Sequence, residues 1–160
     1  MAKIGIFYGS TTGVCEDIAN RIAAKTGGDV FSCTEIDKAP DYDVILLGSS
    51  TWGAGEVQDD WYDAMDRVKA MNLSGRKVAL FSVGDSSGYS DTFCGALAPL
   101  YDSVKDTGAE VCPGPGIEGY TFDASEGVVD GKWLGLALDE TNEPDKTDAR
   151  IDSWIASVGL

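Results

Sequence analysis

Three short segments combine hydroxyl, glycine and aromatic residues in patterns that suit ligand binding. The first, residues 9–15 (GSTTGVC), places Ser10, Thr11 and Thr12 directly before a predicted helix. Backbone N–H groups and the dipole at a helix N-terminus bind anions. The segment holds no lysine or arginine and matches neither a Walker A nor a GxGxxG pattern, so the expected anion is a monophosphate held by neutral donors. The structural alternative is a Ser/Thr-rich turn that only caps the helix.

The other two segments each carry an aromatic residue. Residues 49–55 (SSTWGAG) contain Trp52 followed by glycines, which let a ligand approach the backbone closely. Residues 84–94 (GDSSGYSDTFC) contain Tyr89 on a glycine-containing turn, with Asp85 available for hydrogen bonding. Two aromatics on neighbouring loops predict a flat ring held between them. Alternatively, Trp52 folds onto the core and the third segment is a plain surface turn.

These segments follow predicted strands. Apolar runs predict strands at residues 3–8, 29–33, 43–48, 77–83 and 110–112, and helical spacing predicts helices at 13–26, 58–71, 91–107 and 145–158. Pro99 predicts a kink or a later start in the third helix. Alternating strands and helices predict a parallel sheet covered on both faces. Because such sheets bind ligands beyond the carboxyl ends of their strands, we expect the three segments to converge.

Composition excludes several classes of chemistry. The chain has 160 residues, 27 acidic and 12 basic, a net charge of −15 and no histidine. Ser-His-Asp and Cys-His nucleophiles and His-ligated metals are therefore excluded. The charge argues against nucleic acid and anionic membranes. With no apolar span and no signal peptide, we expect a cytoplasmic protein whose four spaced cysteines are free buried thiols.

Four stretches together resemble the flavodoxin family in order along the whole chain: residues 4–13 (IGIFYGSTTG), 48–61 (GSSTWGAGEVQDDW), 83–93 (VGDSSGYSDTF) and 131–151 (GKWLGLALDETNEPDKTDARI). The resemblance implies one FMN-binding domain over residues 1–160, an α/β fold with a doubly wound five-stranded parallel sheet in the order 2-1-3-4-5. Residues 115–132 resemble the insertion that splits the fifth strand in long-chain flavodoxins, and residues 133–138 would resume that strand.

The resemblance also implies a function. It predicts a low-potential carrier of single electrons rather than an enzyme, with non-covalently bound FMN cycling between semiquinone and hydroquinone. Trp52 corresponds to the aromatic on the inner face of the flavin ring and Tyr89 to the one on the outer face. Gly53 and Ala54 correspond to the peptide that hydrogen-bonds flavin N5 in the semiquinone, and Asp145 to a position near the ribityl hydroxyls.

The full set of cofactor-binding residues implied by the resemblance includes no catalytic residue and no metal ligand. It comprises Ser10, Thr11, Thr12, Gly13, Val14, Cys15, Ser50, Thr51, Trp52, Gly53, Ala54, Gly55, Val83, Gly84, Asp85, Tyr89, Thr92, Phe93, Cys94 and Asp145. Cys15 stands where the family usually has a hydroxyl residue. It is either a weak donor to the phosphate or a thiol activated by the helix N-terminus.

The acidic charge is concentrated in the later part of the chain. Residues 1–53 carry a net charge of −3 and residues 54–160 a net charge of −12. An acidic run follows the tryptophan segment: Glu56, Asp59, Asp60, Asp63 and Asp66. It is either a solvated helix face or a surface that steers basic partners. The resemblance implies a monomer served by a basic flavodoxin/ferredoxin reductase-type donor and a low-potential acceptor such as nitrogenase reductase or a radical-enzyme activase.

The same residues argue against two other functions. An FMN-dependent quinone reductase would need an open flavin face, which aromatics on both sides would close. A response regulator would need acidic residues after the first strand and a phosphoacceptor Asp after the third, where the chain reads Tyr8-Gly9-Ser10 and Gly48-Ser49-Ser50. The acidic insertion could stabilise the fold or recognise partners.

Overall fold

The computed structural model describes residues 3–9, 13–52 and 56–160, without the side chain of Trp52. Within these residues a mixed sheet has a parallel centre in the order β2-β1-β3-β5. The strands are β1 (Ile4–Gly9), β2 (Asp29–Ser32), β3 (Val44–Trp52) and β5 (Lys77–Val83). The short β4 (Glu56–Val57) pairs antiparallel with the end of β3.

The fifth parallel position is shared by two short strands. β6 (Glu110–Val111) pairs with Lys77 and Val78 at the start of β5, and β9 (Leu136–Leu138) pairs with its end. The sheet therefore has the predicted order 2-1-3-4-5 with the fifth strand split. The intervening chain contains an antiparallel pair, β7 (Val128–Val129) and β8 (Lys132–Trp133).

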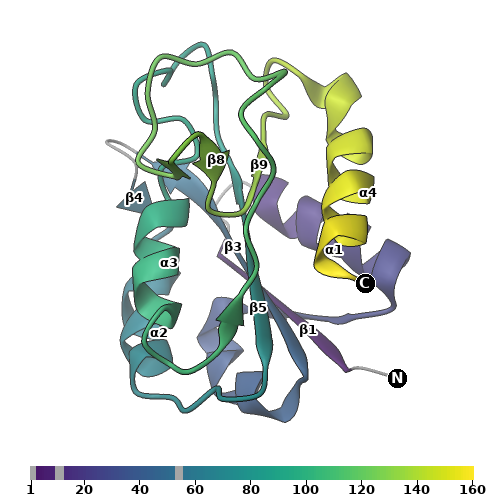
Figure 1. The fold of residues 1–160 in the computed structure, drawn as a ribbon, viewed down its shortest axis with the longest axis vertical. Helices are drawn as coiled ribbons and strands as arrows, with labels where there is room; N and C mark the ends of the chain where they lie inside the picture. The colour runs from purple at the N-terminus through teal and green to yellow at the C-terminus, as the bar shows by residue number, and fades with distance from the viewer. Residues whose placement is uncertain (1–2, 10–12, 53–55) are drawn as a thin grey trace.

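Helices cover both faces of the sheet (Figure 1). Strand residues alternate between the faces, so Ile6 packs under α1 (Val14–Thr26) and α4 (Thr147–Val158), whereas Phe7 faces the opposite layer. That layer contains α2 (Asp60–Lys69) and α3 (Leu97–Val104). Two 3₁₀ segments, η1 (Cys33–Asp41) and η2 (Pro144–Lys146), complete the elements.

Several predicted boundaries differ from the observed ones. The third helix begins at Leu97 instead of residue 91, because residues 84–95 form turns and Cys94 has a left-handed backbone (φ 51°). Pro99 then occupies the first turn of α3, where its missing N–H costs little. η1 was not predicted. β3 is longer than predicted, because Ser49 and Ser50 still pair with β5 and its last two residues pair with β4.

The inserted segment packs on the edge of the sheet through aromatic rings. Tyr120 and Phe122 both contact Trp133, and the Tyr120 hydroxyl donates to the Ala137 carbonyl at 2.8 Å. Val128 packs there too, whereas Val129 is exposed. The insertion is therefore an integral part of the core in the described structure.

All four cysteines are free and buried, as predicted. None of the helices among the described residues is long and apolar enough to cross a membrane.

Candidate functional site

A pocket of about 290 Å³ opens beyond the carboxyl ends of β3, β5 and β9, beside the N-terminus of α1. Ten of the predicted cofactor residues line it: Val14, Ser50, Thr51, Val83, Gly84, Asp85, Tyr89, Thr92, Phe93 and Cys94. Glu140 and Thr141 complete the lining and were not predicted. The volume lies just below the usual range of ligand pockets, about 300–1,000 Å³.

The N-terminus of α1 lies at this pocket and is the element suited to bind an anion. Gly13 precedes the helix with a left-handed backbone (φ 89°), and Asp17 N donates to the Gly13 carbonyl at 3.0 Å. A Cβ at Gly13 would have open space around it, so backbone conformation alone favours glycine there. No basic side chain lies in the first turn of α1. Backbone N–H groups are thus the donors that the described part of this site offers to an anion.

The loop after β5 holds Tyr89 at the pocket. Tyr89 is 57% exposed and lines the pocket, so its ring offers a flat surface to a ligand bound there. Asp85 shapes this loop, because its Oδ1 accepts from Ser87 N at 3.0 Å and from Gly88 N at 2.9 Å. The Gly88 N–H and the Asn142 side chain lower the pKa of Asp85, so this carboxylate is ionised at neutral pH.

Backbone atoms form much of the pocket floor. A Cβ at Gly84 would lie 2.9 Å from Cys94 N and 3.0 Å from Phe93 Cδ1, so only glycine fits between them. The Cys94 thiol is buried and donates to the Ser82 and Leu138 carbonyls, each at 3.6 Å. Phe93 is also buried and packs on Trp133. Phe93 and Cys94 thus hold the floor in place with their side chains turned into the core.

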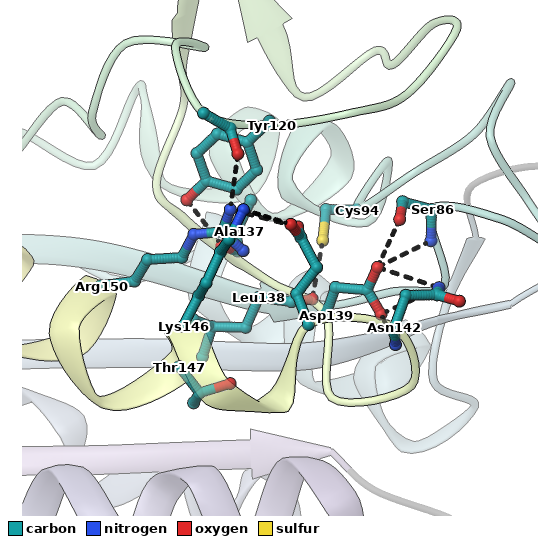
Figure 2. A network of polar contacts seen from close by, with 12 residues as sticks. Ser86, Cys94, Tyr120, Ala137, Leu138, Asp139, Asn142, Lys146, Thr147 and Arg150 are labelled. Atoms are coloured by element: carbon teal, nitrogen blue, oxygen red, sulfur yellow. Dashed lines mark hydrogen bonds and ion pairs between the residues drawn. The ribbon is translucent and has the colours of Figure 1, made fainter.

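A buried carboxylate connects the two loops that flank the pocket (Figure 2). Asp139 is fully buried and accepts from Ser86 N at 3.2 Å, from Ser86 Oγ, and from Thr141 N at 3.1 Å. It also accepts from Asn142 N at 2.9 Å, while Asn142 Nδ2 reaches Asp85 Oδ1 at 2.7 Å. The Tyr89 loop and the loop after β9 are therefore joined through one side chain.

The sequence contains a pattern that points to Glu140 and Thr141, the two lining residues that were not predicted. Asp139 to Asn142 directly follow the strand predicted at 133–138, and the carboxyl ends of parallel strands are where such sheets bind ligands. The loop after this strand therefore belongs to the same edge as the three segments above.

Asp145, by contrast, is not brought to this pocket. It lies exposed in η2 and lines a separate cavity. The pocket's acidic residue from this region is Glu140, which forms an ion pair with Arg21 and accepts from Thr147 Oγ1 at 2.9 Å.

Cys15 is buried in the core beneath α1 and is not among the residues that line the pocket. Burial raises the pKa of its thiol, which disfavours a reactive thiolate. A reactive role is thus disfavoured, whereas a contact between Cys15 and the phosphate stays a prediction, because residues 10–12 beside it lie outside the described residues.

The remaining predicted contacts lie outside the described residues: Ser10, Thr11, Thr12, Gly53, Ala54, Gly55 and the Trp52 side chain. The backbone of Trp52 ends β3 and pairs with Glu56. Thr51 lies at the pocket, with its Oγ1 2.9 Å from Ser82 Oγ.

An acidic surface adjoins the β3–β4 end of the sheet. Glu56 lies in β4, Asp59 directly precedes α2, and Asp60, Asp63 and Asp66 lie in α2; all five are exposed. Asp63 is paired with Arg67, so its charge is partly neutralised. We refer to these five residues as the acidic face.

Comparison with known proteins agrees with this architecture. The sequence profile of the family described as Flavodoxin matches residues 6–154. Flavodoxin 1 of Azotobacter vinelandii is 42% identical over 166 residues, covering 98% of this chain and 95% of that protein. Flavodoxin of Synechococcus elongatus is 39% identical over 164 residues, covering 99% and 96%.

Among solved structures, Fusobacterium nucleatum flavodoxin bound to flavin mononucleotide superposes with a TM-score of 0.92 at 28% identity, covering 99% of this chain and 97% of that one. The profile match, the full-length similarity and the shared topology together show that this chain belongs to the flavodoxin family.

Proposed function

We propose that this chain carries single electrons on FMN held non-covalently in the pocket beyond β3, β5 and β9. The observation that carries the proposal is the exposed Tyr89 ring, which lines one pocket together with Gly84 and with Val14, the first residue of α1. The family consists of electron carriers rather than enzymes, and the solved relative binds FMN.

The described residues fit the cofactor. The phosphate would lie at the N-terminus of α1, where neutral N–H donors suit a monophosphate. The flavin ring would stack on Tyr89, with Trp52 on its other face, since a flat ring gains most from aromatic contact on both sides. Thr51, Gly84 and Asp85 line the pocket, and we assign them to the ribityl chain and the ring edge. Gly53 and Ala54 remain our candidates for the peptide that bonds flavin N5.

The flavin, when bound, supplies the electron chemistry, and the protein sets its potentials. We propose that the working couple is semiquinone to hydroquinone at low potential. Asp85 is ionised, and the whole chain carries a net charge of −15, so adding negative charge at this site is electrostatically unfavourable. The low potential thus follows from the carboxylates around the site.

We further propose basic redox proteins as partners, a reductase-type donor and a low-potential acceptor, meeting the monomeric protein in the cytoplasm. The acidic face lies at the end of the sheet that holds the pocket, where it would steer such partners. Four free thiols favour a reducing compartment.

Anaerobic titration of the FMN-loaded protein with dithionite, followed by absorbance, tests the proposed couple. We expect FMN to bind with quenched fluorescence and a blue neutral radical to accumulate at half-reduction. Failure to bind FMN would refute the cofactor assignment. Two-electron reduction without a radical, or sustained NADPH-to-quinone turnover without added reductase, would favour a quinone reductase instead.

A further inference from the structure

The insertion, residues 115–132, extends from the sheet edge to the loop that carries Tyr89. The Ser90 carbonyl accepts from Asp123 N and from Ala124 N, both at 2.9 Å. The Ser90 hydroxyl donates to Asp123 Oδ2, also at 2.9 Å. Three hydrogen bonds therefore join two consecutive residues of the insertion to the residue that directly follows Tyr89.

Aromatic rings of the insertion contact the same loop a few residues later. Phe93 lines the pocket, and its ring centre lies 5.8 Å from that of Phe122 and 6.3 Å from that of Tyr120. The Tyr120 hydroxyl donates to a carbonyl of β9, and the Arg150 guanidinium carbon lies 3.9 Å from the Tyr120 ring centre (Figure 2). The insertion is thus anchored to the sheet and to α4, and it holds the loop at Ser90 and at Phe93.

The position of the Tyr89 ring depends on the backbone that carries it, because the side chain is exposed and has little packing of its own. Tyr89 N donates to the Asp85 carbonyl at 2.9 Å, and the Tyr89 carbonyl accepts from Thr92 N at 3.1 Å. Ser90 lies inside this second turn. Since side-chain rotamers depend on the local backbone, fixing Ser90 also restricts the Tyr89 ring.

Asp123 is the side chain through which the insertion makes this contact. Its carboxylate accepts from the Ser90 hydroxyl, and hydrogen bonds to a carboxylate are stronger than those between neutral groups. Asp123 is exposed and is not among the residues that line the pocket. Any effect of Asp123 on a ligand there would therefore pass through Ser90 and Tyr89.

We propose that Asp123 is a positioning residue for the cofactor. It holds Ser90, and through Ser90 it holds Tyr89 so that the tyrosine ring meets one face of the bound flavin in a fixed orientation. This inference rests on the proposed function, because it concerns FMN in the pocket beside Tyr89. It gives the insertion a role at the cofactor site in addition to its packing on the sheet.

Fluorescence titration of the apoprotein with FMN tests the proposal in two variants of Asp123. Asp123→Ala removes the acceptor and should weaken FMN binding about threefold to fivefold, a modest loss because the backbone bonds to Ser90 remain. The saturated complex should also fluoresce more than the parent complex, since a displaced Tyr89 ring quenches the flavin less. Asp123→Asn removes the same charge but keeps an acceptor oxygen, so it should match the parent in both measurements.

Two further variants separate positioning from a general loss of stability. Glu126 is exposed in the same insertion and makes none of these bonds to Ser90, so Glu126→Ala should bind FMN as the parent does. In a Tyr89→Ala background, Asp123→Ala should cause no additional loss of affinity, because the ring that Asp123 positions is already absent. A general destabilisation would weaken binding again in that background.

Each contrary result has a separate meaning. Parental affinity and fluorescence in Asp123→Ala would overturn this inference and leave the proposed function intact. An Asp123→Asn variant as weak as Asp123→Ala would assign the effect to charge, and an additive loss in the Tyr89→Ala background would assign it to stability; either result overturns the inference. Failure of the parent to bind FMN would refute the proposed function and this inference with it.

Discussion

At the scale of single residues, the pocket depends on a few side chains with separate tasks. Tyr89 is exposed and offers a stacking surface, whereas Asp139 is buried and fixes the loops. Gly84 allows the backbone at the pocket floor to pack closely on Cys94, because any side chain there would collide with Cys94. Tyr89 therefore serves ligand binding, whereas Asp139 and Gly84 shape the pocket.

Tyr89→Ala should weaken FMN binding about tenfold and raise flavin fluorescence, because a stacking and quenching ring is lost. Tyr89→Phe keeps the ring and should bind FMN nearly as the parent does. Fluorescence titration of the apoprotein measures both effects. If Tyr89→Ala binds FMN unchanged, Tyr89 does not stack on the cofactor. Trp52→Ala tests the other face in the same way.

Asp139→Asn should lower the free energy of unfolding by about 2–3 kcal/mol, since a buried acceptor of several hydrogen bonds becomes partly a donor. It should also weaken FMN binding, because the Tyr89 loop loses its tie to residues 140–142. Urea unfolding and FMN titration give the two values. Asp145→Asn, at an exposed position outside the pocket, is the control, and equal effects of the two substitutions would contradict the proposed connection.

At the scale of elements, β3, β5 and β9 end together at one edge of the sheet, where α1 begins. Parallel pairing places their carboxyl ends side by side, so loops distant in sequence share one pocket. α2 follows β4 directly and carries much of the acidic face at the same end.

Neutralising Glu56, Asp59 and Asp60 to their amides should slow electron transfer to a basic c-type cytochrome at low salt. The rate should also become less sensitive to ionic strength, because steering charges are removed. Stopped-flow kinetics over a salt series measures both. Asp41, Asp106 and Glu110, exposed near the amino ends of the parallel strands, provide a control of equal charge. A control variant that slows equally would show that net charge, and not this face, controls the rate.

At the scale of the whole molecule, acid should destabilise the fold. Hydrogen bonds from Gly88 and Asn142 lower the pKa of Asp85, and Lys146 and Arg150 lower that of Glu143. A carboxylate with a lowered folded-state pKa contributes stability that is present above its unfolded value, about 4, and is lost as pH falls through the folded value.

The Tm of the apoprotein should therefore drop between about pH 5 and pH 2. In the Glu143→Gln variant that drop should be smaller, since one linked group is absent. Differential scanning calorimetry across this range checks the prediction. The same slope in parent and variant would mean that Glu143 does not contribute to the acid transition.

Much of this protein could be predicted from its residues alone. Apolar runs and helical spacing give the parallel sheet, and the glycine and hydroxyl segments after three strands give most of the pocket. These features are local, because strand propensity, turn conformation and helix starts depend on residues adjacent in sequence. The family resemblance supplied the split fifth strand and the cofactor.

Other features depended on contacts between distant residues. Asp139 reaches Ser86 across 53 positions, and Cys15 points into the core and not toward the pocket. The turn at η2 carries Asp145 to a different cavity, where it meets the insertion. The sequence by itself determined the elements and their order, because these follow from local pattern. Tertiary packing alone decided which side chains face the pocket, because burial and loop-to-loop hydrogen bonds exist only once the layers have come together.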